Sequence, residues 1–449
     1  MIFIKIILGL FGLGIVVFVH ELGHFLAAHL AKIDVEAFSI GWGNPILKKK
    51  IGSVEYRLGM FPIGGYCKMK GETDYGELWE NMRNGKKPED GSYLAAGPAA
   101  RIFVHFGGPF FNLVFAVILL SLFWGFGFEI NTFSNKIILA SEIIPGETYP
   151  ADSAGLKTGD RIIEIAGKPI SYYHEVQENI ALNPDKDLPV LVERNGEILK
   201  LNVTPSLDKS TGAGKIGVYF WVDTVIKNIK DGSPAQMAGL MPGDRITSAN
   251  GQKLRNSMDL MKIVEQNPDR LVLDYDRAGA VGEVQFSNDE IKNEIGITWN
   301  SISYRTPNLS LPSAIAKGVK ESWKTLTVSI TSLRLLFKGI DLTKAVSGPM
   351  RITYMIGEMA TQSFEQGFGT SVRSITDFLA LISIALCVMN LLPLPILDGG
   401  MIVLFLVELI RRKPAHPKAI SVFQTCGIVI IFGLMVFAVF GDILFFIRQ

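Results

Sequence analysis

Four apolar segments, each long enough to cross a lipid bilayer, constrain this 449-residue chain more than any other feature. They cover roughly residues 2–31, 102–128, 375–397 and 422–447. The composition is 48% hydrophobic and 19% charged, which is too apolar for an average soluble protein and too polar for a chain that lies wholly in a bilayer. We therefore predict a multi-pass α-helical membrane protein with four transmembrane helices and an aqueous region.

Basic residues in two short loops predict how the spans are oriented. The loop after the first span contains Lys48-Lys49-Lys50, and RRKPAHPK at 411–418 joins the last two spans. Short loops rich in Lys and Arg stay in the cytoplasm. Both termini and the long middle region, about 129–370, are thus expected on the opposite side. The net charge is +1 and no basic face dominates, so we expect no nucleic-acid partner.

The middle region contains an internal repeat. DSAGLKTGDRIIEIAGKPI at 152–170 aligns with SPAQMAGLMPGDRITSANGQKL at 233–254, and the two copies are offset by 84 residues. Two copies at so long a period predict tandem β-rich domains, each with its own core, rather than a solenoid. The spacing resembles PDZ domains of the bacterial protease-associated type, which commonly bind extended peptides at a sheet edge. A role as spacers or steric plugs is the alternative.

The first apolar segment contains His20-Glu21-Leu22-Gly23-His24, although ionisable groups inside a membrane are costly and usually functional. On a helix, His20 and His24 lie one turn apart on one face and can meet one metal ion. Glu21 points about 100° around the helix and can reach a water on that metal. This H-E-x-x-H arrangement is typical of zinc hydrolases, in which the glutamate takes the water proton. Alternatively, the three side chains only satisfy one another in a helix bundle.

A zinc hydrolase needs a third protein ligand and an open position. The best candidate is Asp398 in MNLLPLPILDGG at 389–400, a lone carboxylate at the end of the third span. Pro393 and Pro395 break the helix just before it, and irregular backbone at membrane depth is tolerated only inside protein or at a wet cavity. Asn390 could hydrogen-bond an extended peptide there, or act only as a cap or an interhelical hydrogen bond.

These motifs, in this order, resemble the site-2 protease family of intramembrane zinc metalloproteases. The resemblance rests on HELGH at 20–24, GGPFFN at 107–112, the two PDZ-like units, and N-x-x-P-x-P-x-x-D-G at 390–399. It covers nearly the whole chain. Two PDZ-like units make the chain most similar to bacterial members that clip membrane-spanning anti-sigma factors after a first cut outside.

The resemblance implies a particular set of site residues. It places zinc (Zn²⁺) on His20, His24 and Asp398, makes Glu21 the catalytic base, and gives Asn390 a part in substrate binding. The exact substrate is left open, because members of the family differ.

The segment SVEYRLGMFPIGGYCKMKG at 53–71 alternates apolar and polar residues and then has turn residues at Pro62 and Gly64-Gly65, which predicts a β-hairpin. It resembles the family's membrane-associated β-loop. A strand edge there would hold a substrate extended, because a helical substrate hides its backbone. We assign substrate binding to Gly64 and Gly65, together with Asn112. An ordinary cytoplasmic hairpin is the alternative.

Two further features lie near the core. Residues 313–340 form an amphipathic pattern that predicts a helix on the membrane surface or against the PDZ-like units. Gly348-Pro349 then predicts a hinge. His105 and Asn112 are about two helical turns apart, so both could face one neighbour; we expect interhelical hydrogen bonds rather than metal binding from both.

The predicted function is an inner-membrane zinc endopeptidase that cleaves single-span membrane proteins, such as anti-sigma factors after a first cut or signal-peptide remnants. The PDZ-like units would be periplasmic and the active site would lie toward the cytoplasmic side, in contact with membrane lipid. The alternatives are a metal-ion transporter and an inactive PDZ scaffold. The predicted domains are a membrane core at 1–128, PDZ-like units at 129–220 and 221–308, a surface helix and hinge at 309–370, and a second membrane core at 371–449.

Overall fold

The computed structural model describes most of the chain in two compact units. Unit 1 comprises residues 1–128 and 306–449, and unit 2 comprises residues 129–305. The described residues are 2–72, 76, 79–81, 84–85, 88–144, 146–209, 211–266, 268–292, 295–335, 348–365, 368–413 and 415–447.

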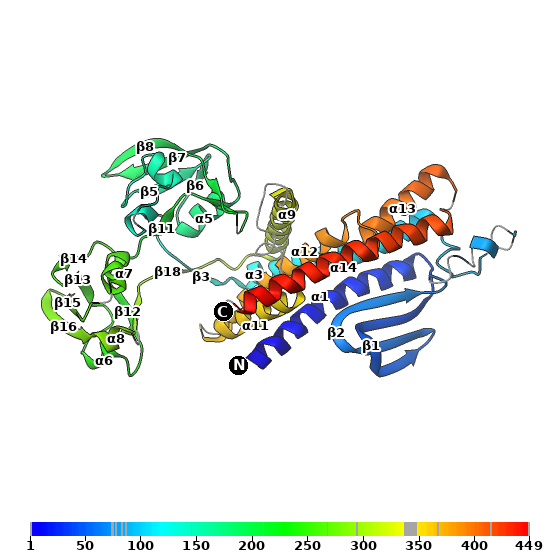
Figure 1. Cartoon of the computed structure of the whole chain (residues 1–449), viewed down its shortest axis with the longest axis horizontal. Helices are drawn as coiled ribbons and strands as arrows, with labels where there is room; N and C mark the ends of the chain where they lie inside the picture. Colours follow the sequence, from blue (N-terminus) through cyan, green and yellow to red (C-terminus); the bar gives the residue numbers. More distant parts are fainter. Residues whose placement is uncertain are drawn as a thin grey trace. The chain divides into compact units, whose positions relative to one another are not determined.

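Unit 1 is built from long helices and one two-stranded sheet. Figure 1 shows the helices running along one another, with the sheet against the C-terminal half of the first helix. The helices are α1 (Ile2–Leu30), α3 (Pro98–Phe126), α9 (Leu311–Leu335), α11 (Pro349–Glu365), α12 (Phe368–Asn390), α13 (Asp398–Arg411) and α14 (Pro417–Ile447).

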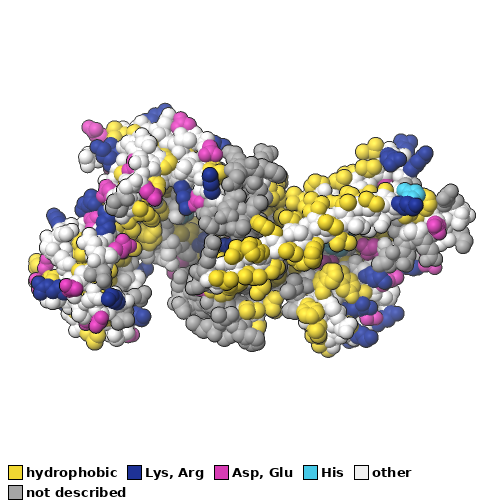
Figure 2. All heavy atoms as spheres, viewed as in Figure 1, with side chains coloured by type: hydrophobic (Ala, Val, Ile, Leu, Met, Phe, Trp, Pro, Cys, Tyr) yellow, Lys and Arg dark blue, Asp and Glu magenta, His cyan; other side chains and the backbone are white. Residues whose placement is uncertain are grey.

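Four of these helices are long and apolar enough to cross a membrane, as the sequence predicted. Within the described residues the spans are Ile6–Leu30, Pro98–Phe126, Arg373–Asn390 and Pro417–Ile447. Hydrophobic side chains cover the visible face of α14, which is the surface that lipid requires (Figure 2). The third span ends at Asn390 and not near residue 397, because the proline-containing segment that follows is not helical.

The sheet consists of β1 (Val35–Ile51) and β2 (Val54–Met69), which pair antiparallel. Residues 37–40 have partners on both sides, at 65–68 and at 55–58, so the two bent strands make a broader sheet than a simple hairpin. Residues 55–58 run in the same direction as 37–40 and residues 65–68 run in the opposite direction, so the chain does turn back at the predicted Pro62 and Gly64-Gly65. The predicted hairpin pairing is wrong, because residues 37–40 lie between its two arms. The chain also reverses at Gly52, and Gly64, with φ of 80°, bends β2 without ending it.

Helix α9 confirms the helical pattern, and its location on the membrane surface stays a prediction. Its Leu326 packs against a small core between α3 and α12, and Gly318 lies so close to Ser121 of α3 that a side chain would clash. The core comprises Ala116, Leu120, Ala380 and Ile384. The helix thus packs on the other helices of unit 1, while residues 336–340 of the predicted helix lie outside the described residues.

Helix α11 begins at the predicted Gly348-Pro349 hinge. Asp442 of α14, which is fully buried, accepts hydrogen bonds from the backbone N–H groups of Gly348, Met350 and Arg351. A carboxylate that takes three N–H groups at a helix start stabilises it strongly. The break is thus also a capped helix start, and its action as a hinge stays a prediction.

Unit 2 contains the same four-stranded sheet twice. The strand orders are β6-β5-β7-β8 and β14-β13-β15-β16, and one short helix follows the second strand of each copy. The first copy contains β3 (Glu129–Thr132), β4 (Ile137–Leu139), α4 (Pro150–Ser153), β5 (Arg161–Ile165), β6 (Lys168–Pro169), α5 (Tyr173–Ala181), β7 (Leu188–Arg194), β8 (Glu197–Val203), β9 (Ser206–Leu207), β10 (Gly214–Lys215) and β11 (Val218–Phe220). The second contains β12 (Ile226–Ile229), α6 (Pro234–Met237), β13 (Arg245–Ala249), β14 (Gln252–Lys253), α7 (Ser257–Glu265), β15 (Arg270–Arg277), β16 (Ala280–Ser287), α8 (Asn288–Lys292), β17 (Ile297–Trp299) and β18 (Ile302–Arg305).

The repeated motif explains why both copies fold alike. Each copy has its own apolar core, in which Ile162 and Ile246 occupy equivalent, fully buried positions. The Asp of each Gly-Asp turn is buried and paired with an arginine at the end of the third strand, Asp160 with Arg194 and Asp244 with Arg277. The repeat is thus a repeat of structure, with a buried ion pair fixing the same turn in each copy.

Candidate metal centre

Three side chains of unit 1 bring their ligand atoms together at one point. Nε2 of His20 and Nε2 of His24 are 3.2 Å apart, and Oδ2 of Asp398 lies 3.3 Å from the first and 3.4 Å from the second. Among the described residues, these three side chains form the cluster of His, Cys, Asp or Glu that could hold a metal ion. Tetrahedral zinc with bonds of 2.0–2.1 Å needs ligand atoms about 3.3 Å apart, so two imidazoles and one carboxylate here fit that ion.

Glycines allow the helices that supply these ligands to approach closely. A side chain on Gly23 of α1 would clash with the backbone of Gly107 in α3, and one on Gly108 would clash with His20 and His24. Small residues of this kind let membrane helices pack backbone to backbone. The GG of the GGPFFN motif is therefore what brings α3 against the face of α1 that carries the histidines.

Two more glycines position the carboxylate. Asp398 is the first residue of α13, and Gly399 and Gly400 lie against the backbone carbonyls of Leu391 and Leu394. Any side chain on either glycine would push α13 away from the proline-containing segment. The Asp-Gly-Gly sequence thus sets where the carboxylate enters the membrane core.

Hydrogen bonds from neighbouring residues orient the ligands. Nδ1 of His24 lies 2.9 Å from the carbonyl oxygen of Val104, and as the donor it leaves Nε2 free to ligate. Nδ1 of His105 lies 3.0 Å from Oδ1 of Asp398, and the Tyr93 hydroxyl is 2.7 Å from Nε2 of His105. A chain from Tyr93 through His105 therefore holds the oxygen of Asp398 that does not face the histidines.

Asn112 supports the same tautomer for His20. Its amide group lies 3.2 Å from Nδ1 of His20, and its Oδ1 is buried without a hydrogen-bond partner as drawn. Turning the amide by 180°, which heavy-atom positions do not distinguish, pairs Oδ1 with an Nδ1–H group. Oδ1 of Asn112 then has a partner, and Nε2 of His20 is free for a metal.

Glu21 lies between the ligands and the sheet. Its side chain is buried, and the backbone N–H of Cys67 in β2 donates to its carboxylate. A side chain on Gly65 would lie 3.0 Å from Cγ of Glu21, so β2 passes directly over it. Gly64 lies instead against the indole of Trp42.

Comparison with known proteins matches nearly the whole chain to one family. Peptidase family M50 matches residues 8–434. The chain belongs to peptidase family M50. It is 34% identical to a protein named putative zinc metalloprotease from Treponema pallidum, over 98% of this chain and 99% of the other. It is 31% identical to one of that name from Borreliella burgdorferi, over 98% of both chains, and 28% identical to the regulator of sigma-E protease RseP from Escherichia coli, over 96% of both.

The comparisons establish the enzyme class that the motifs predicted. This M50 peptidase is a zinc metalloprotease of the site-2 protease type, and its substrates are embedded in membranes. The structure brings Asn390 and Asn112 into the same site, because both amides lie next to the His20 ring. Of the predicted substrate-binding residues, Gly65 also lies there, and Gly64 does not.

Sequence reasoning missed part of the peptidase site. His105 and Asn112 form the predicted interhelical hydrogen bonds, but with different neighbours, since His105 reaches Asp398 and Asn112 reaches His20. Tyr93 was not predicted at all, because it lies in a segment between elements with no periodic pattern. The only available signal was His105 itself, a polar group in an apolar span that needed a partner.

Proposed function

We propose that this M50 peptidase is an intramembrane endopeptidase in which His20, His24 and Asp398 hold the zinc ion and Glu21 is the catalytic base. The observation that carries the proposal is that three ligand atoms lie 3.2–3.4 Å apart, and that two of them belong to α1, a helix long and apolar enough to span a membrane. Unpaired polar groups are expensive at that depth, so a cluster that converges on one point indicates a function.

The residues around the ligands have separate tasks in peptide hydrolysis. Zinc, when bound, lowers the pKa of a bound water to about 7 and polarises the scissile carbonyl. Glu21 accepts the proton of the attacking water and delivers it to the leaving amine. Asn390, with its Nδ2 3.3 Å from Nε2 of His20, is placed to hydrogen-bond the substrate backbone beside the ligands.

The sheet gives the substrate an extended partner. Residues 65–69 of β2 pair with β1 on one side only, and the N–H of Cys67 on the other side points to Glu21. A substrate that unwinds can pair with this edge, which replaces the backbone hydrogen bonds that it loses with its helix. This pairing would hold the scissile carbonyl beside Glu21, the catalytic base.

Unit 2 contributes substrate selection through its PDZ-like copies. A cavity of about 430 Å³ lies beside α5 in the first copy, lined by that helix and by residues 213–219. A groove between a helix and a strand accepts an extended peptide by strand addition. We propose that these units are periplasmic in the inner membrane, that the active site lies toward the cytoplasm, and that unit 2 recognises ends left by a first cut, as in anti-sigma factors or signal-peptide remnants.

The test compares Glu21→Gln with the native chain and with Glu36→Gln, an exposed glutamate of the sheet. Each purified protein is incubated in detergent with a single-span reporter, intact or truncated on its outer side, and its zinc content is measured. We expect the native chain and Glu36→Gln to cut, and Glu21→Gln to retain zinc and lose cleavage by at least about 1000-fold. Equal cleavage by Glu21→Gln would exclude it as the base.

A further inference from the structure

A second concave site lies on the opposite side of α1 from the metal ligands. It is a groove of about 650 Å³ between α1 and one face of the β1–β2 sheet. Three α1 residues one turn apart, Phe18, Leu22 and Phe25, form one wall, and Phe38 packs edge-on against both phenylalanines at 5.9 Å and 5.6 Å. The other apolar lining residues are Ile40, Leu47, Tyr56 and Leu58.

The rim of the groove is cationic. Its charged lining residues are Lys48, Lys49 and Arg57, and no acidic residue is among the described residues that line it. Lys49 is on the same face of the sheet as Tyr56, whereas Lys48 and its strand partner Arg57 alternate to the other face. Arg57 donates to Glu55 at 2.8 Å and to the Tyr66 hydroxyl at 3.0 Å. Among the described residues Lys49 has no ion pair, so its charge is available to a ligand in the groove.

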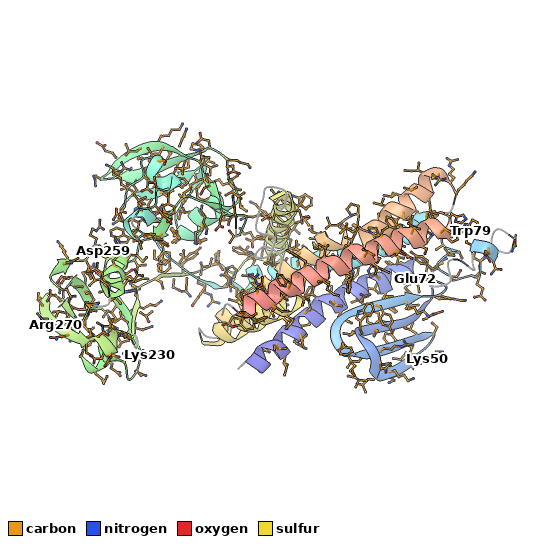
Figure 3. All side chains as sticks on the ribbon, viewed as in Figure 1. Lys50, Glu72, Trp79, Lys230, Asp259 and Arg270 are labelled. Atoms are coloured by element: carbon orange, nitrogen blue, oxygen red, sulfur yellow. The ribbon has the colours of Figure 1, made fainter. Side chains whose placement is uncertain are left out.

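The groove lies at the depth of the membrane. Its α1 wall falls inside the candidate span Ile6–Leu30, where the surrounding solvent is lipid. Figure 3 places Lys50, the next residue after the rim lysines, at the end of the sheet nearer the C-terminal end of α1. Figure 2 shows basic and hydrophobic side chains side by side on this sheet. The apolar floor of the groove lies within the span and its basic residues lie toward the end of the span. This arrangement matches the acyl chain and the anionic headgroup of one phospholipid.

We propose that this groove binds one anionic phospholipid, with an acyl chain against the aromatic floor and the phosphate on Lys49. A soluble anion would use Lys49 but leave the apolar walls in contact with water. A peptide strand would use a free strand edge, whereas the groove presents side chains from the face of the sheet. The same sheet carries Gly65 beside Glu21, so the bound lipid braces the strand above the catalytic base.

The test measures lipid binding, so it does not depend on protease activity. The full-length protein in detergent is titrated with phosphatidylglycerol or phosphatidylcholine, and bound lipid is counted by native mass spectrometry. One variant is Lys49→Gln, and a second is Leu47→Asn, an exposed residue of the groove wall. Lys50→Gln is the matched control, because Lys50 belongs to the same basic run but does not line the groove.

We expect one tightly held phosphatidylglycerol, weaker binding of phosphatidylcholine, and about fivefold weaker phosphatidylglycerol binding in Lys49→Gln, since one lysine near an anionic headgroup contributes about 1 kcal/mol. Leu47→Asn should weaken both lipids, and Lys50→Gln should change neither. Equal binding of the two lipids, or an equal loss in Lys50→Gln, would overturn the proposal. So would displacement of the lipid by glycerol 3-phosphate or by an apolar peptide.

Discussion

Asp244 of unit 2 and Asp398 of unit 1 are both carboxylates with little exposure, but their surroundings differ. In unit 2, Asp244 accepts two hydrogen bonds from Arg277 at 2.7 Å and 2.8 Å and one from the backbone N–H of Met241 at 2.8 Å. In unit 1, Asp398 accepts from His105 with one oxygen and directs the other at His20 and His24. The charge of Asp244 is neutralised by the guanidinium of Arg277. The free oxygen of Asp398 instead faces the Nε2 lone pairs of His20 and His24.

This difference distinguishes a structural acid from a ligand. A buried charge is tolerated when it is paired and hydrogen-bonded, and the Asp–Arg pair of unit 2 meets that condition without any added ion. Three ligand atoms about 3.3 Å apart repel one another until a cation lies between them. The structural acid is also repeated, at Asp160 and Asp244, whereas Asp398 has no counterpart in the repeat.

The largest expected effect comes from removing the negative charge of Asp398, compared with removing that of Asp244. Asp398→Asn should lower zinc affinity by more than about 100-fold, beyond the effect of removing a hydrogen-bonding neighbour, and should abolish cleavage. Asp244→Asn should leave the zinc content unchanged. Metal analysis of the purified proteins after dialysis decides the matter. If Asp398→Asn kept its zinc, the assignment of the third ligand would be wrong.

The next effect concerns the hydrogen bond that orients the ligand. His105→Phe should lower zinc affinity by about 10–100-fold, because Asp398 loses the partner of its second oxygen. Tyr93→Phe removes only the outer hydrogen bond to His105 and should have a smaller effect. Competition with a zinc chelator measures both affinities. An equal loss in the two variants would mean that disturbed packing, and not ligand orientation, causes the change.

In unit 2 the same kind of substitution should affect folding alone. Asp244→Asn removes a charged hydrogen-bond acceptor for Arg277 and should destabilise the second copy by about 2 kcal/mol. Hydrogen exchange of the full-length protein should show faster exchange in residues 226–299 and unchanged exchange in α1. Cleavage should persist. Loss of zinc in this variant would break the distinction between the two acids.

The smallest effect is a dependence on pH. The hydrogen bond from Arg277 lowers the pKa of Asp244 below its ordinary value of 3.8. The stability that this pair contributes is therefore fully present above about pH 4 and is lost as the pH falls through the lower, folded-state pKa. The difference in hydrogen exchange between native chain and Asp244→Asn should shrink between pH 5 and pH 3. A difference that grew on acidification would contradict the ion pair.

Much of the site could be predicted from short-range patterns. The spacing of His20 and His24 places both on one helix face whatever else the chain does. The third ligand was identified because Asp398 is a lone carboxylate after a proline-broken span. The pairing of the sheet could not be predicted in this way, since the arms on either side of Gly64 were expected to pair with each other and in fact both pair with residues 37–40 of β1. A glycine with positive φ permits either geometry, and only the pairing with β1 selects one.

The sequence by itself determined the four spans, the repeat and the H-E-x-x-H face, because apolar length and helical period are local properties of the chain. Tertiary structure alone decided that Asp398 meets the histidines, that Asn112 and His105 serve different ligands, and that β2 lies over Glu21. These contacts join helices far apart in the sequence. They depend on close packing at glycines and on hydrogen bonds between buried polar groups. The sequence shows that a glycine or a buried polar group needs a neighbour, but it does not show which residue that neighbour is.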